Sequence, residues 1–230
     1  MAGRNKRAGK AERFFSIPQD ISALSSFSAL LSVLYTLVLM VNEPTIPPEE
    51  LQALVLKAQE GDTEAFGKIY DAYLTPVYRY VVFRFPEDLA EDLVADIFVK
   101  AWEKLHTYKA RKGIPFAAWL FRIARYSVID AYRSTRGFEE IPENLVDENQ
   151  QNDPKAKTEQ GMSVAIVRRA LGQLPKGFRD VLLMHYVAGL GHSEVARTLG
   201  MSEGHIRILK FRGLKKLEDL LAHYRPNQHE

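Results

Sequence analysis

Residues 192–209 read HSEVARTLGMSEGHIRIL, and this stretch decides the fold of the C-terminal part of the chain. A helix-turn-helix unit needs a small residue where its two helices touch, a glycine at the turn and apolar residues at fixed later positions. These requirements are met by Ala196, Gly200, Ile206 and Leu209. The stretch therefore predicts two helices joined by a tight turn.

Local features of the same stretch predict its caps and its buried side. We expect Ser193 to cap the first helix and Ser202 to cap the second, because a serine hydroxyl accepts a hydrogen bond from the first turn. Met201 should pack beneath the turn. The buried positions of the first helix are expected to be Val195, Ala196 and Leu199, and those of the second Ile206 and Leu209.

The second of these helices is strongly basic, since residues 203–217 carry five lysines or arginines and only one acid, Glu203. A recognition helix places its N-terminal residues at base edges and its basic residues against phosphates. Candidates for base contact are Ser202, Glu203, His205 and Arg207. Candidates for phosphate contact are Lys210, Arg212 and Lys215. A solvated basic face is the alternative for any single lysine, but the whole helix after that turn favours DNA.

The composition of the chain limits the functions that it can have. The chain has 230 residues and a formal net charge of only +2, so a nucleic-acid role rests on where the charges lie. Cysteine is absent, which excludes disulfides and zinc–thiolate sites and fits a reducing cytoplasm. No glycine-rich phosphate loop and no nucleophile–base pattern stands out, so we expect no catalytic residue, no metal and no cofactor.

Apolar residues recur at three- and four-residue intervals through most of the chain after Pro47, and none of it alternates like a strand. Thr63 should cap a helix after the break at Gly61, and Pro86 should end that helix. Residues 138–161 hold seven acids against two lysines, with few apolar residues, and predict a flexible linker. The expected fold is all-α, with small helical domains at 47–137 and 162–224 and a tail at 225–230.

Residues 116–136 place two different faces on one helix at 100° per residue. The apolar face gathers Ala117, Leu120, Phe121, Ile123, Ala124, Val128 and Ala131. The opposite face gathers Arg122, Arg125, Tyr126, Ile129, Tyr132, Arg133 and Arg136, with Trp119 at its edge. Arginines beside exposed aromatic rings suit single-stranded nucleic acid, whose bases stack on the rings. Tyrosines at the rim of a packed helix are the alternative.

Two neighbouring segments add to this domain. The basic loop with Lys109, Arg111 and Lys112 is a candidate to hold a flipped base. The helix before it carries Asp92 and Asp96 near aromatic residues, a pattern that repels DNA and suits a basic protein partner. Core aromatics with solvated acids explain that helix equally well.

The first 46 residues differ from the rest. A basic start precedes residues 21–41, which carry no charge and are long enough to span a bilayer. The segment is compatible with a membrane anchor, with a signal peptide or with a third interpretation, in which translation begins at Met40. Five serines dilute the apolar run, and no small-x-small cleavage site follows it. We favour the start at Met40 over the anchor.

Four stretches of the chain carry a family resemblance. The first domain contains EGDTEAFGKIYDAYLTPVYRYVVFRF, AEDLVADIFVKAWEKLHTYK and FAAWLFRIARYSVIDAYR, and the second contains LGQLPKGFRDVLLMHYVAGLGHSEVARTLGMSEGHIRILKFRGLKKL. The first three resemble region 2, and the last resembles region 4, of the extracytoplasmic-function (ECF) group of RNA polymerase sigma factors in the sigma-70 family. The similarity covers residues 51–221, and the segment before Met40 has no counterpart in the family.

The resemblance implies a promoter-directing factor that works with core RNA polymerase in the cytoplasm. The helix with Asp92, Asp96, Phe98 and Trp102 would bind the clamp helices of the β′ subunit, and the β flap would be a second contact. The −10 element would be recognised and opened by Lys109, Arg111, Lys112, Trp119, Arg122, Arg125, Tyr126, Tyr132 and Arg133. The helix from Ser202 to Lys215 would read the −35 element. An anti-sigma factor is a further partner, and any membrane link would be indirect.

One position departs from the group's pattern. Tyr126 follows RIAR where the group often carries asparagine, so the usual −10 base preference is not carried over and stacking is favoured over hydrogen bonding. Two other functions stay open from the residues alone. A stand-alone helix-turn-helix regulator would bind duplex DNA tightly without polymerase, and a membrane-tethered signalling protein would use residues 21–41.

Overall fold

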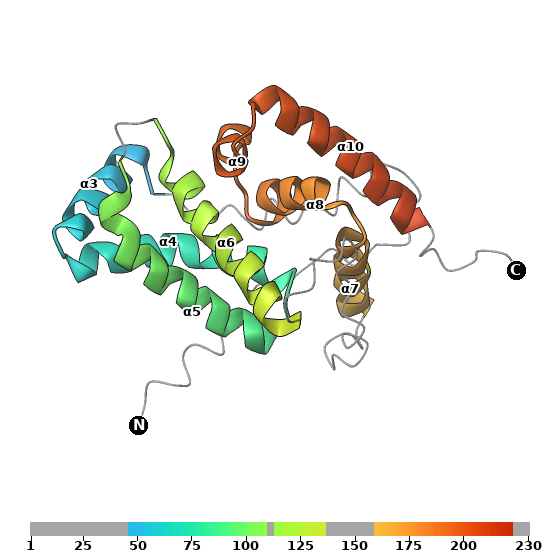
Figure 1. The fold of residues 1–230 in the computed structure, drawn as a ribbon, viewed down its shortest axis with the longest axis horizontal. Coiled ribbons are helices and arrows are strands. Elements are labelled where there is room, and N and C mark those ends of the chain that lie inside the picture. Colours follow the sequence, from blue (N-terminus) through green and yellow to red (C-terminus); the bar gives the residue numbers. More distant parts are fainter. Residues whose placement is uncertain (1–45, 110–112, 137–158, 223–230) are drawn as a thin grey trace, which may run out of the picture.

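The computed structural model describes residues 46–109, 113–136 and 159–222 (Figure 1). These residues form helices and contain no strand, so the predicted all-α fold is confirmed for them. The first domain comprises α3 (Pro48–Gln59), α4 (Thr63–Val82), α5 (Glu87–Lys104), the short turn η2 (Leu105–Thr107) and α6 (Phe116–Arg136). The second comprises α7 (Glu159–Gly172), α8 (Lys176–Leu182), the π-helical turn η6 (Leu183–Val187), α9 (His192–Leu199) and α10 (Glu203–Ala222).

The first domain is built around α4, which packs against α3, α5 and α6. Its buried side includes Tyr80, whose ring meets the ring of Phe121 on α6 at 5.5 Å. The predicted cap at Thr63 is wrong. Asp62 lies before the first turn, and its carboxylate accepts hydrogen bonds from the amides of Glu64 and Ala65 at 2.9 and 3.0 Å. A carboxylate there also faces the positive end of the helix dipole, so Asp62 is the better cap of the two neighbours.

Contacts between elements far apart in sequence fix the end of α5. Gln59, at the end of α3, donates hydrogen bonds from Nε2 to the carbonyl oxygens of Leu105 and Tyr108, at 2.8 and 2.9 Å. Tyr108 in turn donates from its hydroxyl to the carbonyl oxygen of Ile114 at 3.0 Å. One side chain therefore joins the end of α3 to both ends of the turn that follows α5.

The helix-turn-helix is present at α9 and α10, with Gly200 between them in a left-handed conformation at φ 70°. The Ser202 hydroxyl accepts from the amide of His205 at 3.2 Å, which confirms the second predicted cap. The first is wrong, because α9 starts after Gly191, and Glu194 reaches back to accept from the Gly191 amide at 2.8 Å. The prediction that Met201 packs beneath the turn is also wrong, because 41% of its surface is exposed.

The burial pattern of the helix-turn-helix otherwise follows the prediction. Val195, Ala196 and Ile206 are buried, while Leu199 and Leu209 are half-buried against the core. Thr198 is a buried polar residue that the apolar pattern did not identify. Its hydroxyl donates to the Glu194 carbonyl oxygen one turn earlier in α9 at 2.8 Å and lies 3.3 Å from the Ala118 carbonyl oxygen of α6.

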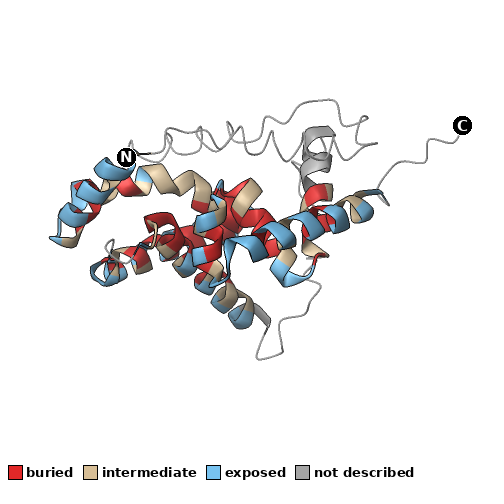
Figure 2. Ribbon diagram, turned by 90° about the horizontal axis from the view of Figure 1, so that it is seen from above, coloured by how far each residue is buried: buried red, intermediate tan, exposed pale blue. Residues whose placement is uncertain are grey.

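The two domains pack against each other. α6 contacts α5 and α4 on one side and α9 on the other, and α4 also contacts η6. Figure 1 shows α6 lying between the rest of the first domain and α8 and α9, with α10 on the far side of α8. In Figure 2 the buried residues continue through the middle of the molecule, and exposed residues lie on the outer faces of the helices. The predicted linker lies outside the described residues up to 158, and its last three residues belong to α7.

The apolar segment at 21–41, the proposed start at Met40 and the tail after 222 also lie outside the described residues. Among the helices that are described, none is both long and apolar enough to cross a bilayer.

Replacement of Gly200 by alanine tests the turn. A Cβ at this position meets no heavy atom within 4 Å, so the cost is the left-handed backbone alone, about 1 kcal/mol. Gly67 is the matched control, because it lies inside α4 with equally open space. We expect Gly200→Ala to lower the thermal midpoint and Gly67→Ala to raise it slightly. A similar change of the same sign in both variants would contradict the assignment.

Candidate nucleic-acid interface

The candidate −35 surface lies on the first turns of α10. Glu203, His205 and Arg207 are exposed, and Arg207 lies 3.6 Å from the Glu203 carboxylate in a surface ion pair. Ser202 is exposed as well, although its hydroxyl serves the helix cap. Farther along, Arg212 and Lys215 are exposed, so these six predicted residues lie on accessible parts of one helix.

Lys210 differs from its neighbours because it is half-buried. Its Nζ lies 3.4 Å from Nε2 of His185 on η6, and the His185 ring lies 4.6 Å from that of His192 at the start of α9. Burial lowers the pKa of His185. The hydrogen bond to the Leu190 carbonyl oxygen acts in the opposite direction but does not reverse the shift. Burial lowers the pKa of Lys210 too, with nearby Arg207 adding to the effect. Lys210 therefore fastens α10 to η6 at least as much as it faces solvent.

The candidate −10 surface on α6 is only partly accessible. Tyr126 is 57% exposed, and Arg122 and Arg133 also lie at the surface. Arg133 lies 3.8 Å from Asp130 on the same helix, in an exposed pair of little energetic weight. Arg122, however, donates from Nη2 to the carbonyl oxygen of Arg197 on α9 at 2.6 Å. Lys109 is exposed, whereas Arg111 and Lys112 lie outside the described residues.

Two aromatic residues of the predicted −10 set are held by the first domain itself. Trp119 is half-buried, with its ring 5.5 Å from Tyr108 and 5.3 Å from Phe116. Tyr132 stacks on Phe85 at 4.4 Å and donates from its hydroxyl to the Arg84 carbonyl oxygen at 2.9 Å. Of the predicted aromatic residues on α6, Tyr126 is therefore the one whose ring is open for stacking on a base.

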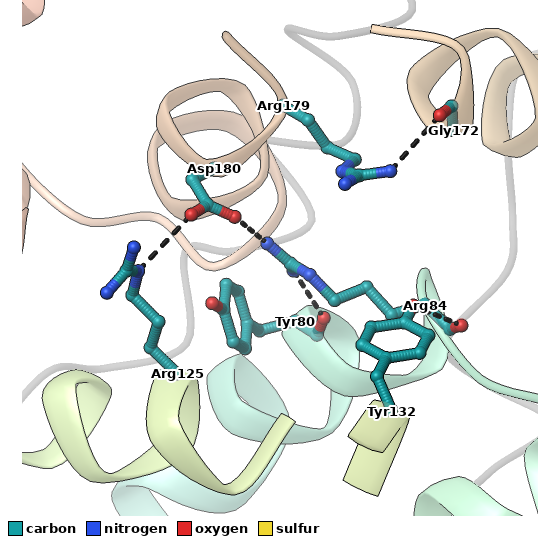
Figure 3. A network of polar contacts seen from close by, with 7 residues as sticks. All are labelled: Tyr80, Arg84, Arg125, Tyr132, Gly172, Arg179 and Asp180. Carbon is teal, nitrogen blue, oxygen red and sulfur yellow. Dashed lines mark hydrogen bonds and ion pairs between the residues drawn. The ribbon is translucent and has the colours of Figure 1, made fainter. Parts of the chain in front are cut away.

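Arg125, the remaining arginine of this set, faces the second domain. Its Nε lies 3.2 Å from one carboxylate oxygen of Asp180 on α8, and Nη2 of Arg84 lies 2.7 Å from the other oxygen (Figure 3). Arg84 also donates to the Tyr80 carbonyl oxygen at 3.0 Å, with its guanidinium 3.9 Å over the Tyr80 ring. Neither Asp180 nor Arg84 is predictable as part of a site from the sequence, because the periodicity of one segment does not indicate the other.

The comparisons with known proteins agree with this geometry. Residues 69–138 match the family model for Sigma-70 region 2, and residues 165–217 match that for Sigma-70 region 4. The ECF RNA polymerase sigma factor ShbA of Streptomyces griseus is 31% identical over 180 residues, covering 73% of this chain and 93% of that relative. The chain belongs to the ECF RNA polymerase sigma factors.

Two further relatives agree. The ECF sigma factor BldN of Streptomyces coelicolor is 33% identical over 174 residues, which cover 74% of this sigma factor and 66% of BldN. A solved structure of CnrH in complex with the cytosolic domain of CnrY matches with a TM-score of 0.59 and 27% identity, covering 76% of this chain and 98% of CnrH. The helix-turn-helix thus belongs to region 4 of this sigma factor, and α5 and α6 belong to region 2.

The acidic surface of α5 needs one correction. Asp92 and Asp96 are exposed, but Phe98 is only 4% exposed and packs against Tyr70 with ring centroids 4.6 Å apart. Trp102 is half-buried, with its ring 4.9 Å from that of Phe66. Phe98 is therefore a core residue of this sigma factor and no part of its surface. The apolar side chains that α5 does expose beside the acids are Leu89 and Val99.

The His185 environment predicts a pH-dependent stability. Because its pKa is lowered in the folded chain, the unfolded chain takes up the proton first, and stability is lost as the pH falls below about 6.5 toward the folded-state pKa. We expect His185→Gln to reduce the drop in thermal midpoint between pH 7.5 and pH 5.5. His106→Gln, at an exposed histidine of the first domain, is the control and should leave the drop unchanged. An equal reduction in both variants would contradict this role of His185.

Proposed function

We propose that this sigma factor reads the −35 element with α10, opens the −10 element with α6 and binds core polymerase through α5. It carries no catalytic residue of its own, and promoter opening is driven by binding of unstacked bases without nucleotide hydrolysis. We place it in the cytoplasm, where the polymerase works. The observation that carries the proposal is the exposed basic face of α10, presented directly after a well-formed helix-turn-helix turn.

The proposed −35 contacts follow from the position of side chains along α10. His205 and Arg207 lie in the first two turns, where a recognition helix meets base edges in the major groove. Arg212 and Lys215 lie one to two turns later and are exposed, as side chains that bind phosphates must be. Glu203 lies 3.6 Å from Arg207 in an exposed ion pair, which is weak enough for the guanidinium to turn toward DNA.

The proposed −10 contact centres on Tyr126. Its ring is exposed on α6 between Arg122 and Arg133, which supply positive charge on the same helix. A base flipped out of the duplex gains roughly 1–3 kcal/mol by stacking on an aromatic ring, enough to offset much of the cost of unpairing one base. Lys109, Trp119, Arg125 and Tyr132 complete the proposed site at its edges, with Arg111 and Lys112 in the loop.

The proposed polymerase surface lies on α5. Asp92 and Asp96 supply negative charge, and Val99 supplies an exposed apolar contact. Charged residues around an apolar contact are typical of protein interfaces and would repel DNA, which separates this surface from α6. By family likeness the partner is the pair of β′ clamp helices, with the β flap bound by the second domain. Trp102 is a rim contact at most.

We further propose an anti-sigma factor as a regulatory partner. The solved relative CnrH is bound to the cytosolic domain of CnrY, which supports this class of partner for the present chain. A membrane link would then be indirect, through such a partner. A stand-alone regulator is the alternative, and it predicts tight duplex binding without polymerase.

Run-off transcription tests the proposal, with core polymerase, the full chain and DNA from upstream of its own gene. A discrete transcript is expected only when core and the chain are both present. Arg207→Ala should reduce it about tenfold or more, since one good base contact contributes about 1–3 kcal/mol. Lys216→Ala removes an exposed cation from the same helix outside the proposed contacts and should have a much smaller effect. Binding of both variants to core should be unchanged.

The result can contradict the proposal in two ways. Equal loss of core binding in Arg207→Ala would remove the −35 assignment. Tight duplex binding by the chain alone, without transcript and without comigration with core polymerase, would favour the stand-alone regulator.

Tyr126 provides a separate test of promoter opening. We expect Tyr126→Ala to lower the amount of open complex by fivefold to more than a hundredfold, corresponding to one lost stack of roughly 1–3 kcal/mol. Tyr126→Phe keeps the ring and should retain most opening. Fluorescence of 2-aminopurine placed in the −10 element measures the open fraction. Equal loss in both variants would mean that the hydroxyl, and not stacking, is what the site uses.

A further inference from the structure

The second domain covers one side of α6 in the free chain. Ala118 on α6 is fully buried, and its carbonyl oxygen lies 3.3 Å from the Thr198 hydroxyl, which donates to the Glu194 carbonyl oxygen of α9 at 2.8 Å. One turn farther along α6, Arg122 donates to the Arg197 carbonyl oxygen. The small side chain of Ala118 allows α9 to approach this closely, so α9 lies directly on the helix proposed to bind the −10 element.

A buried ion-pair network joins α8 to the same surface. The Asp180 side chain is 9% exposed and pairs with Arg84, which is 4% exposed, and with Arg125, which is 25% exposed. The first domain also holds Arg84, whose guanidinium donates to the Tyr80 carbonyl oxygen and whose own carbonyl oxygen accepts from the Tyr132 hydroxyl, as Figure 3 shows. The second domain therefore inserts one carboxylate between two cations of the first domain.

These contacts use groups that DNA would need. The oxygens of the Asp180 carboxylate and of the Arg197 carbonyl accept hydrogen bonds from Arg125 and Arg122, as phosphate oxygens would. An arginine cannot give the same donors to both. Tyr126, between these two arginines and Arg133, stays exposed, so the surface is partly covered and not abolished.

We propose that the second domain is an intramolecular competitor for the −10 surface, with Asp180 occupying the place of a DNA phosphate. The inference rests on the proposed role of α6 in −10 binding. The chain alone is then closed and binds the −10 strand weakly, and α8 and α9 must leave α6 before Arg122 and Arg125 reach DNA.

The chemistry of the network suits reversible closure. Two partners compensate one buried carboxylate, but their desolvation offsets much of the attraction, so the closed state is favoured without being locked. Removal of the carboxylate alone leaves Arg84 buried without its charged partner. Separation of the domains exposes Arg84 to water, so the loss of Asp180 shifts the equilibrium toward the open chain.

Energy transfer between two dyes on the full chain tests the inference. The natural chain has no cysteine, so Gln52→Cys on α3 and Lys216→Cys on α10 place one dye on each domain at exposed sites. We expect high transfer in the free chain and at least a tenfold shift of the open-to-closed ratio in Asp180→Asn. The control is Asp130→Asn, which makes the same chemical change at an exposed carboxylate of α6. Circular dichroism checks that each variant keeps its helices.

A second measurement adds a single-stranded −10 oligonucleotide to the dye-labelled chain that retains Asp180. Transfer should fall as the oligonucleotide binds, and by fluorescence anisotropy Asp180→Asn should bind it at least tenfold more tightly. Low transfer in the free chain, no response to Asp180→Asn, or DNA binding without a change in transfer would each overturn the inference. High transfer that depends on Asp180, with no oligonucleotide bound by either protein, would instead overturn the −10 role of α6.

Discussion

A carboxylate buried between two guanidinium groups constrains the whole molecule. Asp180 has little access to water and must keep a charged partner, because an unpaired buried charge is strongly destabilising. Both partners belong to the other domain, so the position of α8 is set by α4 and α6. α9 then lies against α6, and α10 lies beyond α8 with its recognition face outward (Figure 1).

This arrangement treats the two DNA-facing helices differently. The first turns of α10 are accessible, whereas α6 shares its arginines with α8 and α9. α6 also has a third role, because its apolar side, with Leu120 and Phe121, forms part of the core of the first domain. A sequence that serves core, partner domain and DNA on one helix leaves few positions at which substitution has a single effect.

Periodicity and turn chemistry predicted the helical fold, the helix-turn-helix and the two faces of α6 from the sequence. Neighbouring candidates were harder to separate. Asp62 and Thr63 are both good caps, and Glu194 outcompetes Ser193 by reaching back to Gly191. The resemblance implies that Phe98 is a polymerase contact, and the sequence of α5 alone does not show that Tyr70 of α4 covers it. In each case the deciding partner lies on another element or one residue away.

The pairing of Asp180 with Arg84 and Arg125 was beyond sequence reasoning for a different reason. These residues are 96 and 55 positions apart from Asp180, and local periodicity carries no information across such a separation. An arginine-rich face has the same composition whether its partner is a phosphate or a carboxylate. The sequence therefore predicted the arginines of the α6 surface correctly, but it could not predict that a carboxylate of the second domain pairs with one of them.

Gln59 has a consequence for where the first domain begins. It ties α3 to the carbonyls of Leu105 and Tyr108, at the mouth of the loop that leads into α6. The region 2 family model starts only at residue 69, ten positions later. The family model is thus shorter than the packed domain, and a fragment cut at residue 69 would lack the side chain that joins α3 to the turn after α5.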